Sequence, residues 1–422
     1  MATVTVRPDR VEPRLLPVGR RAVLPIRVLV VFNSVALYGM ERQVIELFDL
    51  LRPEVEPHFL LSYTTRRRQL PLLVEIERRG LKHSFFSDQT DWPKIGRPRS
   101  LRHAWRMIAA LYKGNRDVLH CARGCDAIYL PAWGYGFFAL LAASYAWLAG
   151  KRVVYCFHDL PHRWHPWLRV ISTLVTHCVH LTRFGYDFAV HTNPYLARKN
   201  TTVCATRTQS QRLCDPDSSV RPALEGKRNL LFIGQLTYIK GFDILLDAFH
   251  MLASSYPDVH LQVLGTSPDE QQVRDRVASM GLESRVHLWG YRENVNDFLD
   301  MAYAYIQSSP PSRVHEAFGR GATEAMACAV PVICFRSGAL REIVVHEGTG
   351  LICEEDDAAC LARNICRLLD NRQLRSSCAS GALSRYQSLY SDEVIRKHWI
   401  QFFSYFRSDA GMGRLSREPA AQ

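Results

Sequence analysis

The chain has 422 residues, of which 47% are hydrophobic and 22% charged. These are the proportions of an ordinary globular enzyme, and the length suggests two or three domains with full hydrophobic cores. The 53 Lys and Arg against 41 Asp and Glu give a net charge of +12. No zinc-finger, RNP or helix-turn-helix signature accompanies this charge, so we expect no nucleic acid as a partner. A substrate with diphosphate groups and an anionic membrane surface both fit it.

The termini and the cysteines bear on the compartment. Twelve cysteines are scattered through the chain without a CxxC pair, which favours reduced thiols in the cytoplasm. Residues 1–24 contain several arginines but no signal-peptide core, so we expect a flexible leader. Residues 127–150 carry no charged side chain, but Pro131, Gly134 and Gly136 interrupt them. This pattern favours a strand, a loop and a buried helix over a membrane span.

Apolar runs and helical patterns alternate over residues 25–215, which predicts a Rossmann-like domain with helices on both faces of a parallel sheet. Residues 26–32 form a β-branched run suited to a strand buried on both faces. Further strands are predicted at 58–63, 127–129 and 153–157, and helices at 41–51, 72–79, 101–112 and 137–148. The pattern is less regular after residue 163, where we predict a helix at 167–184 and a short strand at 188–192.

A second alternating series begins near residue 229, after a polar linker at 216–227, and predicts a second Rossmann-like domain over 228–388. Its predicted strands are 229–233, 259–264, 286–288, 304–307 and 331–335, and its predicted helices are 241–253, 269–280, 295–302, 321–328 and 358–369. An amphipathic, aromatic-rich helix is expected within 389–407, and a disordered tail at 408–422. The fold class is therefore α/β.

Three loops of the second half lie between a strand and a helix, where ligands bind in open α/β sheets and helix N-termini favour anions. In the first, Gly234 permits a tight turn and Lys240 brings a cation to the helix start, although a plain loop with a solvated lysine explains them equally well. In the second, Glu316 and Glu324 are placed to hold two hydroxyl groups of one ligand; two surface carboxylates are the alternative. The third, residues 337–342, allows a ligand close to its glycine or is an ordinary turn.

The order of these loops, together with the run EAMACAVPVI at 324–333, resembles family 4 of the glycosyltransferases. The spacing of Glu316 and Glu324, Glu-x7-Glu, is the mark of that family, and Phe318-Gly319 and residues 349–351 belong to the same pattern. The resemblance is strong over residues 228–370 and weaker at 38–42 and 157–159. It implies the GT-B fold, in which two Rossmann-like domains face across a cleft and the helix at 389–407 packs back on the N-terminal domain.

The resemblance also implies a function: retaining transfer of a sugar from a UDP- or GDP-linked donor, with no cofactor and no essential metal. Glu324 then holds the ribose hydroxyls, Glu316 contacts the donor sugar, and Lys240 neutralises the diphosphate. Gly39 lets the N-terminal loop approach the phosphates, and His158 faces the sugar across the cleft. The predicted catalytic residues are Glu316, His158 and Lys240, and the predicted donor-binding residues are Gly39, Gly234, Lys240, Phe318, Gly319 and Glu324.

Some positions depart from the family pattern. Gln235 stands where the family has an arginine, which weakens diphosphate binding by about 1–3 kcal/mol; Arg320 is a candidate replacement. The family's paired glycines read Tyr38-Gly39 and Gly338-Ala339 here. These departures keep a non-catalytic nucleotide-sugar-binding protein open as an alternative, beside a GT-B sugar-nucleotide epimerase. A nicotinamide oxidoreductase is not expected, because no GxGxxG follows the first strand.

The acceptor is expected to be a glycan or a lipid-linked molecule in cell-surface polysaccharide or glycolipid synthesis. Arg66–Arg68 and the basic region at 97–106 predict peripheral contact with an anionic membrane, and so a cytoplasmic enzyme at the inner face of the cell membrane. His162 and His165 either line an acceptor groove or are structural. The Asp-x-Asp at 215–217 lies in a polar linker, and we do not expect it to bind a metal.

Overall fold

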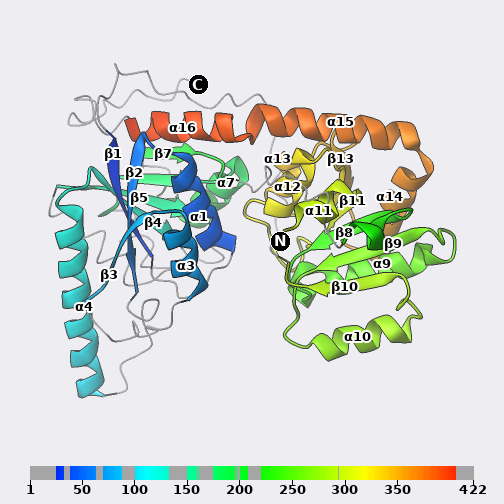
Figure 1. Ribbon diagram of the computed structural model, residues 1–422, viewed down its shortest axis with the longest axis horizontal. Helices are drawn as coiled ribbons and strands as arrows, with labels where there is room; N and C mark the ends of the chain where they lie inside the picture. The colour runs from blue at the N-terminus through cyan, green and yellow to red at the C-terminus, as the bar shows by residue number, and fades with distance from the viewer. Residues whose placement is uncertain are drawn as a thin grey trace.

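The computed structural model describes residues 25–32, 39–62, 70–87, 100–132, 150–158, 160, 174–194, 196, 200–207, 220–292 and 294–404. They form two α/β domains that lie side by side (Figure 1). Helix α15 (Arg372–Leu389) runs along the C-terminal domain, and α16 (Asp392–Ser404) continues over the N-terminal domain (Figure 1). The predicted leader at 1–24 and the predicted tail at 408–422 lie outside the described residues.

The N-terminal domain holds a seven-stranded parallel sheet in the order β3-β2-β1-β4-β5-β6-β7. Its strands are β1 (Ile26–Val31), β2 (Val55–Leu61), β3 (Lys82–Phe85), β4 (Ala127–Ala132), β5 (Arg152–Phe157), β6 (His177–His180) and β7 (Asn200–Val203). Its described helices are α1 (Gly39–Leu50), α3 (Pro71–Arg78), α4 (Leu101–Ala122) and α7 (Arg183–Thr192). Val28 and Val30 enter one hydrophobic cluster, while Leu29 and Val31 enter another. Both faces of β1 are covered, which explains its nearly unbroken apolar sequence.

The C-terminal domain holds a six-stranded parallel sheet in the order β10-β9-β8-β11-β12-β13. Its strands are β8 (Arg228–Ile233), β9 (Val259–Leu264), β10 (Val286–Gly290), β11 (Ala302–Gln307), β12 (Val332–Phe335) and β13 (Gly350–Cys353). Its helices are α8 (Arg221–Leu224), η2 (Tyr238–Lys240), α9 (Phe242–Ala253), α10 (Glu270–Ser279), α11 (Asn296–Asp300), α12 (Arg320–Ala327), α13 (Leu340–Ile343) and α14 (Ala358–Asp370). Helix α8 falls inside the predicted linker, and its Leu224 is buried.

Helix α16 joins the core of the N-terminal domain through aromatic side chains. Trp399 is fully buried, its ring centroid lies 6.1 Å from that of Tyr129, and its indole N–H donates to the carbonyl of Ala205 at 2.9 Å. The ring centroid of Phe403 lies 6.0 Å from that of Phe48 on α1. The C-terminal segment therefore fastens the second domain to the first by burying large rings against it.

Two predicted elements are wrong. The sequence predicts a helix at 167–184 and a strand at 188–192, but the structure has strand β6 at His177–His180 and helix α7 at Arg183–Thr192. The hydroxyl of Thr182 accepts from the backbone N–H of Gly185 at 3.0 Å and caps α7. Thr182 is thus a sequence signal for the start of this helix, but the apolar residues around it hide the signal. Helix α4 also continues ten residues beyond its predicted end at 112. The predicted helix at 137–148 lies outside the described residues.

The helices in the described part of the chain lack the features of a membrane span. A membrane span needs about 20 consecutive, mainly apolar residues. None of these helices combines that length with sufficient apolar character.

Candidate functional site

The first of the three predicted loops joins β8 to α9 and is held tightly against the loop that follows β11. Gly241 caps α9 with φ 67°, and a Cβ there would lie 1.8 Å from the carbonyl oxygen of Ser308. Only glycine fits that backbone approach. The hydroxyl of Ser308 also donates to the carbonyl of Lys240 at 3.0 Å. This seat brings the Lys240 ammonium to 2.7 Å from Oε1 of Glu316.

Glu316, on the second loop, has a side chain that is only 12% exposed, and its carboxylate accepts from three donors. Besides Lys240, the hydroxyl of Ser309 donates to Oε1 at 2.6 Å and the side-chain amide of Gln307 at 3.2 Å. Burial raises the pKa of Glu316, but Lys240 and the other two donors outweigh burial and hold the pKa below its usual value. Glu316 is therefore ionised at neutral pH and able to accept hydrogen bonds from a hydroxylated ligand.

The third predicted loop packs against the backbone of the second. Gly338 has φ 54°, and a Cβ there would lie 2.2 Å from the carbonyl oxygen of Glu316. The backbone N–H of Ala339 donates to that same carbonyl at 2.8 Å, and the hydroxyl of Ser337 donates to the carbonyl of Val314 at 2.7 Å. Contact with the Glu316 backbone thus accounts for the glycine.

Helix α12 starts at the second loop and carries the second predicted carboxylate. Gly319 is its N-cap with φ 76°, and Gly321 approaches Tyr305 so closely that a Cβ would lie 2.1 Å from the phenol oxygen. The Phe318 side chain is buried, and its ring centroid lies 6.1 Å from that of Tyr390. Glu324 lies one turn into α12. The N–H groups at this helix start and Glu324 together offer a site for an anion beside a carboxylate that can bind hydroxyl groups.

Glu324 is part of an ion triad that crosses between the domains. Arg320 donates from Nε to Glu324 at 2.7 Å and from Nη2 to Glu46 of α1 at 3.1 Å. The exposed fractions of the three side chains are only 17% for Arg320, 7% for Glu324 and 3% for Glu46. Burial raises the pKa of Glu46 above its usual value although Arg320 opposes this. Arg320, the candidate replacement for the family's arginine, is therefore committed to two carboxylates.

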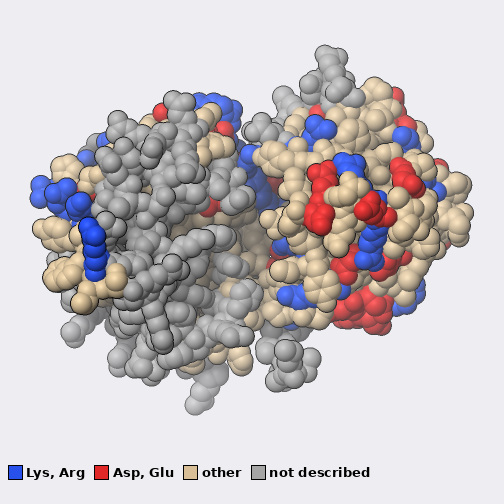
Figure 2. Space-filling view, turned by 90° about the horizontal axis from the view of Figure 1, so that it is seen from below, with Lys and Arg blue, Asp and Glu red and all other residues tan. Residues whose placement is uncertain are grey.

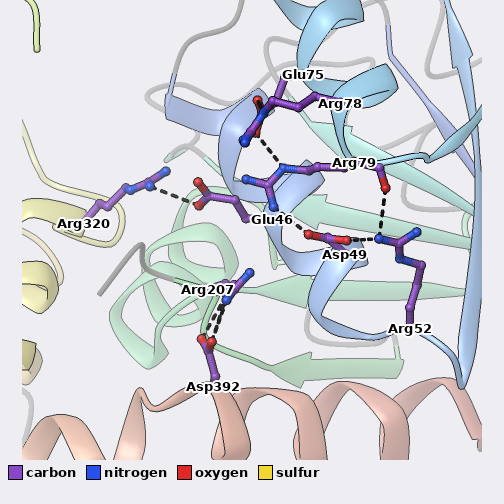
Figure 3. Close-up of polar contacts among 9 residues, drawn as sticks. All are labelled: Glu46, Asp49, Arg52, Glu75, Arg78, Arg79, Arg207, Arg320 and Asp392. Atoms are coloured by element: carbon purple, nitrogen blue, oxygen red, sulfur yellow. Dashed lines mark hydrogen bonds and ion pairs between the residues drawn. The ribbon is translucent and has the colours of Figure 1, made fainter. Parts of the chain in front are cut away.

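The N-terminal side of the triad is itself charged (Figure 3). Arg79 lies 2.6 Å from Asp49 and 2.6 Å from Glu75, and Arg52 pairs with Asp49. Figure 3 shows Arg320 reaching from the C-terminal domain toward Glu46, while Asp49 points to the other side of α1. Glu46 is thus the carboxylate of α1 that meets Arg320 in this network.

The two predicted residues of the opposite domain lie at the end of a strand and at the start of a helix. His158 follows β5; its Nε2 lies 3.2 Å from the phenol oxygen of Tyr129, and burial lowers its pKa to about 4, so the ring is neutral at pH 7. Gly39 opens α1, and a Cβ added to it would meet no atom of the described residues within 4 Å. The hydrogen bonds among the described residues join neither of them to the Lys240–Glu316 pair. Their neighbours at positions 38 and 159 lie outside the described residues.

A second set of interdomain contacts, beside Glu316, is not predicted by the sequence. The carboxylate of Glu342 accepts from the backbone N–H groups of Arg183 and Phe184, both at 2.9 Å, and so caps the first turn of α7. The hydroxyl of Thr182 donates to the carbonyl of Ala317 at 3.2 Å. Nothing local in the sequence signals this, because Glu342 and Arg183 are 159 residues apart.

A metal ion has no ready-made site in the described part of the chain. No group of three His, Cys, Asp or Glu side chains there is arranged to hold one. His162, His165 and the Asp-x-Asp at 215–217 lie outside the described residues, as do Arg66–Arg68.

Comparison with known families places a match on the domain that holds these loops. Residues 216–385 match the family model described as Glycosyl transferases group 1. N-acetyl-alpha-D-glucosaminyl L-malate synthase of Bacillus anthracis is 27% identical over 186 residues, which are 44% of this chain and 48% of the relative. The lipopolysaccharide core biosynthesis mannosyltransferase LpsB of Rhizobium meliloti is 30% identical over 167 residues, 38% of this chain and 46% of the relative. The chain spans about half the length of the curated relatives it matches.

Solved structures match nearly the whole chain. Anabaena HepE in complex with UDP has a TM-score of 0.74 at 18% identity, covering 90% of this chain and 100% of that one. The pneumococcal O-GlcNAc transferase GtfA in complex with UDP and GlcNAc has a TM-score of 0.70 at 9% identity, covering 91% and 100%. At such identities the likeness shows the fold. The predicted fold class is confirmed: the chain has the GT-B fold of two parallel-sheet α/β domains.

Proposed function

We propose that the chain is a retaining glycosyltransferase of family 4 that moves a sugar from a UDP- or GDP-linked donor to a glycan or lipid-linked acceptor in cell-surface polysaccharide or glycolipid synthesis. The observation that carries the proposal is the meeting of Lys240, Glu316 and the start of α12 at the carboxyl edge of the C-terminal sheet. This is the edge at which open α/β sheets bind ligands. The match over residues 216–385 supports the same activity.

Each group has a role that its geometry suits. Glu324, one turn into α12, accepts hydrogen bonds from the ribose hydroxyls, and the N–H groups near Phe318 and Gly319 meet the sugar and phosphates. The ionised Glu316 accepts from the donor sugar. Lys240 stabilises the charge that grows on the leaving diphosphate, an interaction that exists mainly in the transition state. His158 remains a neutral hydrogen-bonding group toward the sugar.

The first experiment is a thermal-shift panel with UDP, GDP and ADP on the wild type and on Glu324→Ala. UDP comes first, because it is the nucleotide in both similar structures. A ligand at a hundred times its dissociation constant adds about 2.7 kcal/mol of stability. We expect a shift with one nucleotide that Glu324→Ala loses and that Glu355→Ala, an exposed carboxylate on the same domain, retains. No shift with any nucleotide would refute the donor site.

Transfer itself is tested with the matching nucleotide sugar and glycan or lipid-linked acceptors, with the anomeric configuration of the product read by NMR. Retention is expected, and Lys240→Met is expected to lower kcat more than nucleotide affinity. Inversion would remove the retaining assignment. Nucleotide-sugar binding without turnover would favour the second candidate, a non-catalytic nucleotide-sugar-binding protein. That candidate is favoured by the exposed Gln235, which leaves the first loop one cation short of the family pattern.

A further inference from the structure

Helix α4 of the N-terminal domain exposes large apolar side chains to an unusual degree. Leu101, Trp105 and Tyr112 have exposed fractions of 83%, 69% and 65%. From Leu101, Trp105 lies about 40° and Tyr112 about 20° around the axis of a helix with 3.6 residues per turn. They therefore form a single stripe along one side of the helix. Scattered exposed hydrophobic residues need no explanation, but an aligned aromatic stripe is typical of a binding surface.

A basic band runs beside this stripe. Arg102, Lys113 and Arg116 are exposed and lie about 60–120° around the axis from Leu101. Residues 101–116 contain no Asp or Glu. The first carboxylate of the helix is Asp117, which accepts from both the backbone N–H and the hydroxyl of Ser87 at 2.7 Å. The described exposed side chains of α4 are thus apolar along one line and positive along the next.

Among the described residues, this surface extends beyond the sheet of the N-terminal domain. The last turns of α4 pack on the sheet, with Val118 and Ala122 buried in the cluster that contains Leu29 of β1. Ser87 lies two residues beyond the carboxyl end of β3, so its bond to Asp117 places residue 117 at that edge of the sheet. The preceding sixteen residues extend the helix by about 24 Å.

The figures agree with this placement. Figure 1 shows α4 reaching well past the strands on the side of the N-terminal domain that is farthest from the C-terminal domain. Figure 2 views the molecule of Figure 1 from below, the direction in which α4 projects, and Lys and Arg side chains lie among uncharged ones over α4 at the left edge. The helix therefore projects beyond the edge at which ligands of an open α/β sheet bind.

We propose that the projecting part of α4, residues 101–116, lies in the interface of an anionic lipid bilayer. Trp and Tyr side chains prefer this zone, because their rings bury in it while their polar atoms stay hydrated. The basic band faces the anionic headgroups, which supply the complementary charge. The interface of an anionic bilayer therefore matches both the aromatic stripe and the basic band.

This inference deepens the proposed function, on which its consequence for the acceptor rests. A bilayer held by α4 would lie opposite the carboxyl edge of the N-terminal sheet, the half that takes the acceptor in the proposed reaction. The acceptor class is then a membrane-anchored lipid whose headgroup reaches that edge, and a freely diffusing glycan is disfavoured.

The test is flotation of the full chain with phosphatidylcholine vesicles, with and without 30 mol% phosphatidylglycerol. Each basic residue near an anionic surface contributes about fivefold to binding. The triple variant Arg102→Gln, Lys113→Gln, Arg116→Gln should therefore bind about 100-fold more weakly. Its matched control removes the same charge from exposed positions of the C-terminal domain, Arg274→Gln, Arg363→Gln and Arg372→Gln, and should bind within about twofold of the wild type.

The apolar stripe is tested separately with Leu101→Ser, Trp105→Ser, against Met251→Ser, Leu389→Ser as exposed controls. The stripe variant should bind at least about tenfold more weakly, since each side chain loses a partly buried apolar surface. Wild-type binding should also fall steeply between 0.01 and 0.5 M salt.

Several results would overturn the inference: a wild type that stays out of the anionic vesicles at low salt, or helix variants that float as well as their controls. Self-association that the stripe variant abolishes, without vesicle binding, would assign the stripe to a second copy instead. Flotation needs no nucleotide. Vesicle binding by a protein whose melting temperature UDP does not raise would therefore contradict the proposed function and leave this inference standing. A rise in melting temperature with UDP, without vesicle binding, would contradict this inference and leave the proposed function standing.

Discussion

Replacing Arg320 by methionine would test whether the interdomain triad holds the two domains together. Methionine keeps most of the aliphatic stem and removes the guanidinium, so Glu46 and Glu324 are left facing each other without their shared cation. Breaking a buried ion pair by removing one partner costs about 3–5 kcal/mol. For a domain of this size that corresponds to a fall in Tm of about 10 °C.

The sign of the pH dependence makes the test specific. Burial already raises the pKa of Glu46, and loss of the opposing cation raises it further. The contribution of Glu46 to the variant's stability is therefore fully present below its ordinary pKa near 4.5 and is lost as pH rises through the raised pKa. The deficit relative to wild type should therefore be larger at pH 8 than at pH 5. The double variant Arg320→Met, Glu46→Gln should recover part of it, because one charge is gone.

Because Glu46 and Arg320 belong to different domains, the variant can also escape by separating them and hydrating Glu46. Thermal unfolding and the radius of gyration from solution scattering are therefore measured together. A loss below about 1 kcal/mol, with no pH dependence and no expansion, would refute the view that the triad couples the domains.

Three further predictions concern single contacts. Gly241→Ala forces a Cβ against Ser308 at positive φ and should lower the free energy of unfolding by at least about 3 kcal/mol, measured by thermal unfolding; a loss under about 1 kcal/mol would contradict the close approach. Burial lowers the pKa of His180 to about 3, so the contribution of this histidine to stability is fully present above pH 6.5 and is lost on acidification. His180→Phe should therefore reduce the fall in the free energy of unfolding between pH 6 and 4 by about 1.4 kcal/mol per pH unit, and equal slopes for the variant and the wild type would contradict it. Glu342→Ala should speed hydrogen exchange at the amides of the first turn of α7 about 10- to 100-fold, while exposed Glu355→Ala leaves it unchanged.

Features that depend on residues close together in the sequence can be predicted from it. The apolar runs of β1 and β8 and the loops that follow them reflect burial on both faces of a parallel sheet, and that burial forces an apolar sequence whatever the neighbours are. The loop residues Gly234, Lys240 and Gly319 are likewise visible from their place between a strand and a helix. Their proposed roles toward a donor remain predictions.

The parts that sequence reasoning misses are held by pairs far apart in the chain. Glu46 and Arg320 are 274 residues apart, and Glu342 caps a helix 159 residues away, so neither pairing has a periodicity or a local motif. Strand β6 is mistaken for a helix because four residues, His177–His180, are too short to show a period. Its identity comes from parallel pairing with β5 and β7, which is a property of the sheet.

The triad also bears on how a diphosphate would be held at the proposed site. Among the described residues, Lys240 and Arg320 are hydrogen-bonded to the site's carboxyl groups, Glu316, Glu324 and Glu46, so two cations face three carboxyl groups. Both cations are already in contact with carboxylates, and Gln235 adds none. A bound diphosphate would therefore depend on the N–H groups and dipole at the start of α12, with Lys240 exchanging part of its contact with Glu316. On the proposed function, that exchange would free Glu316 toward the sugar at the moment the phosphates engage Lys240, so that diphosphate binding and sugar contact are coupled through one lysine.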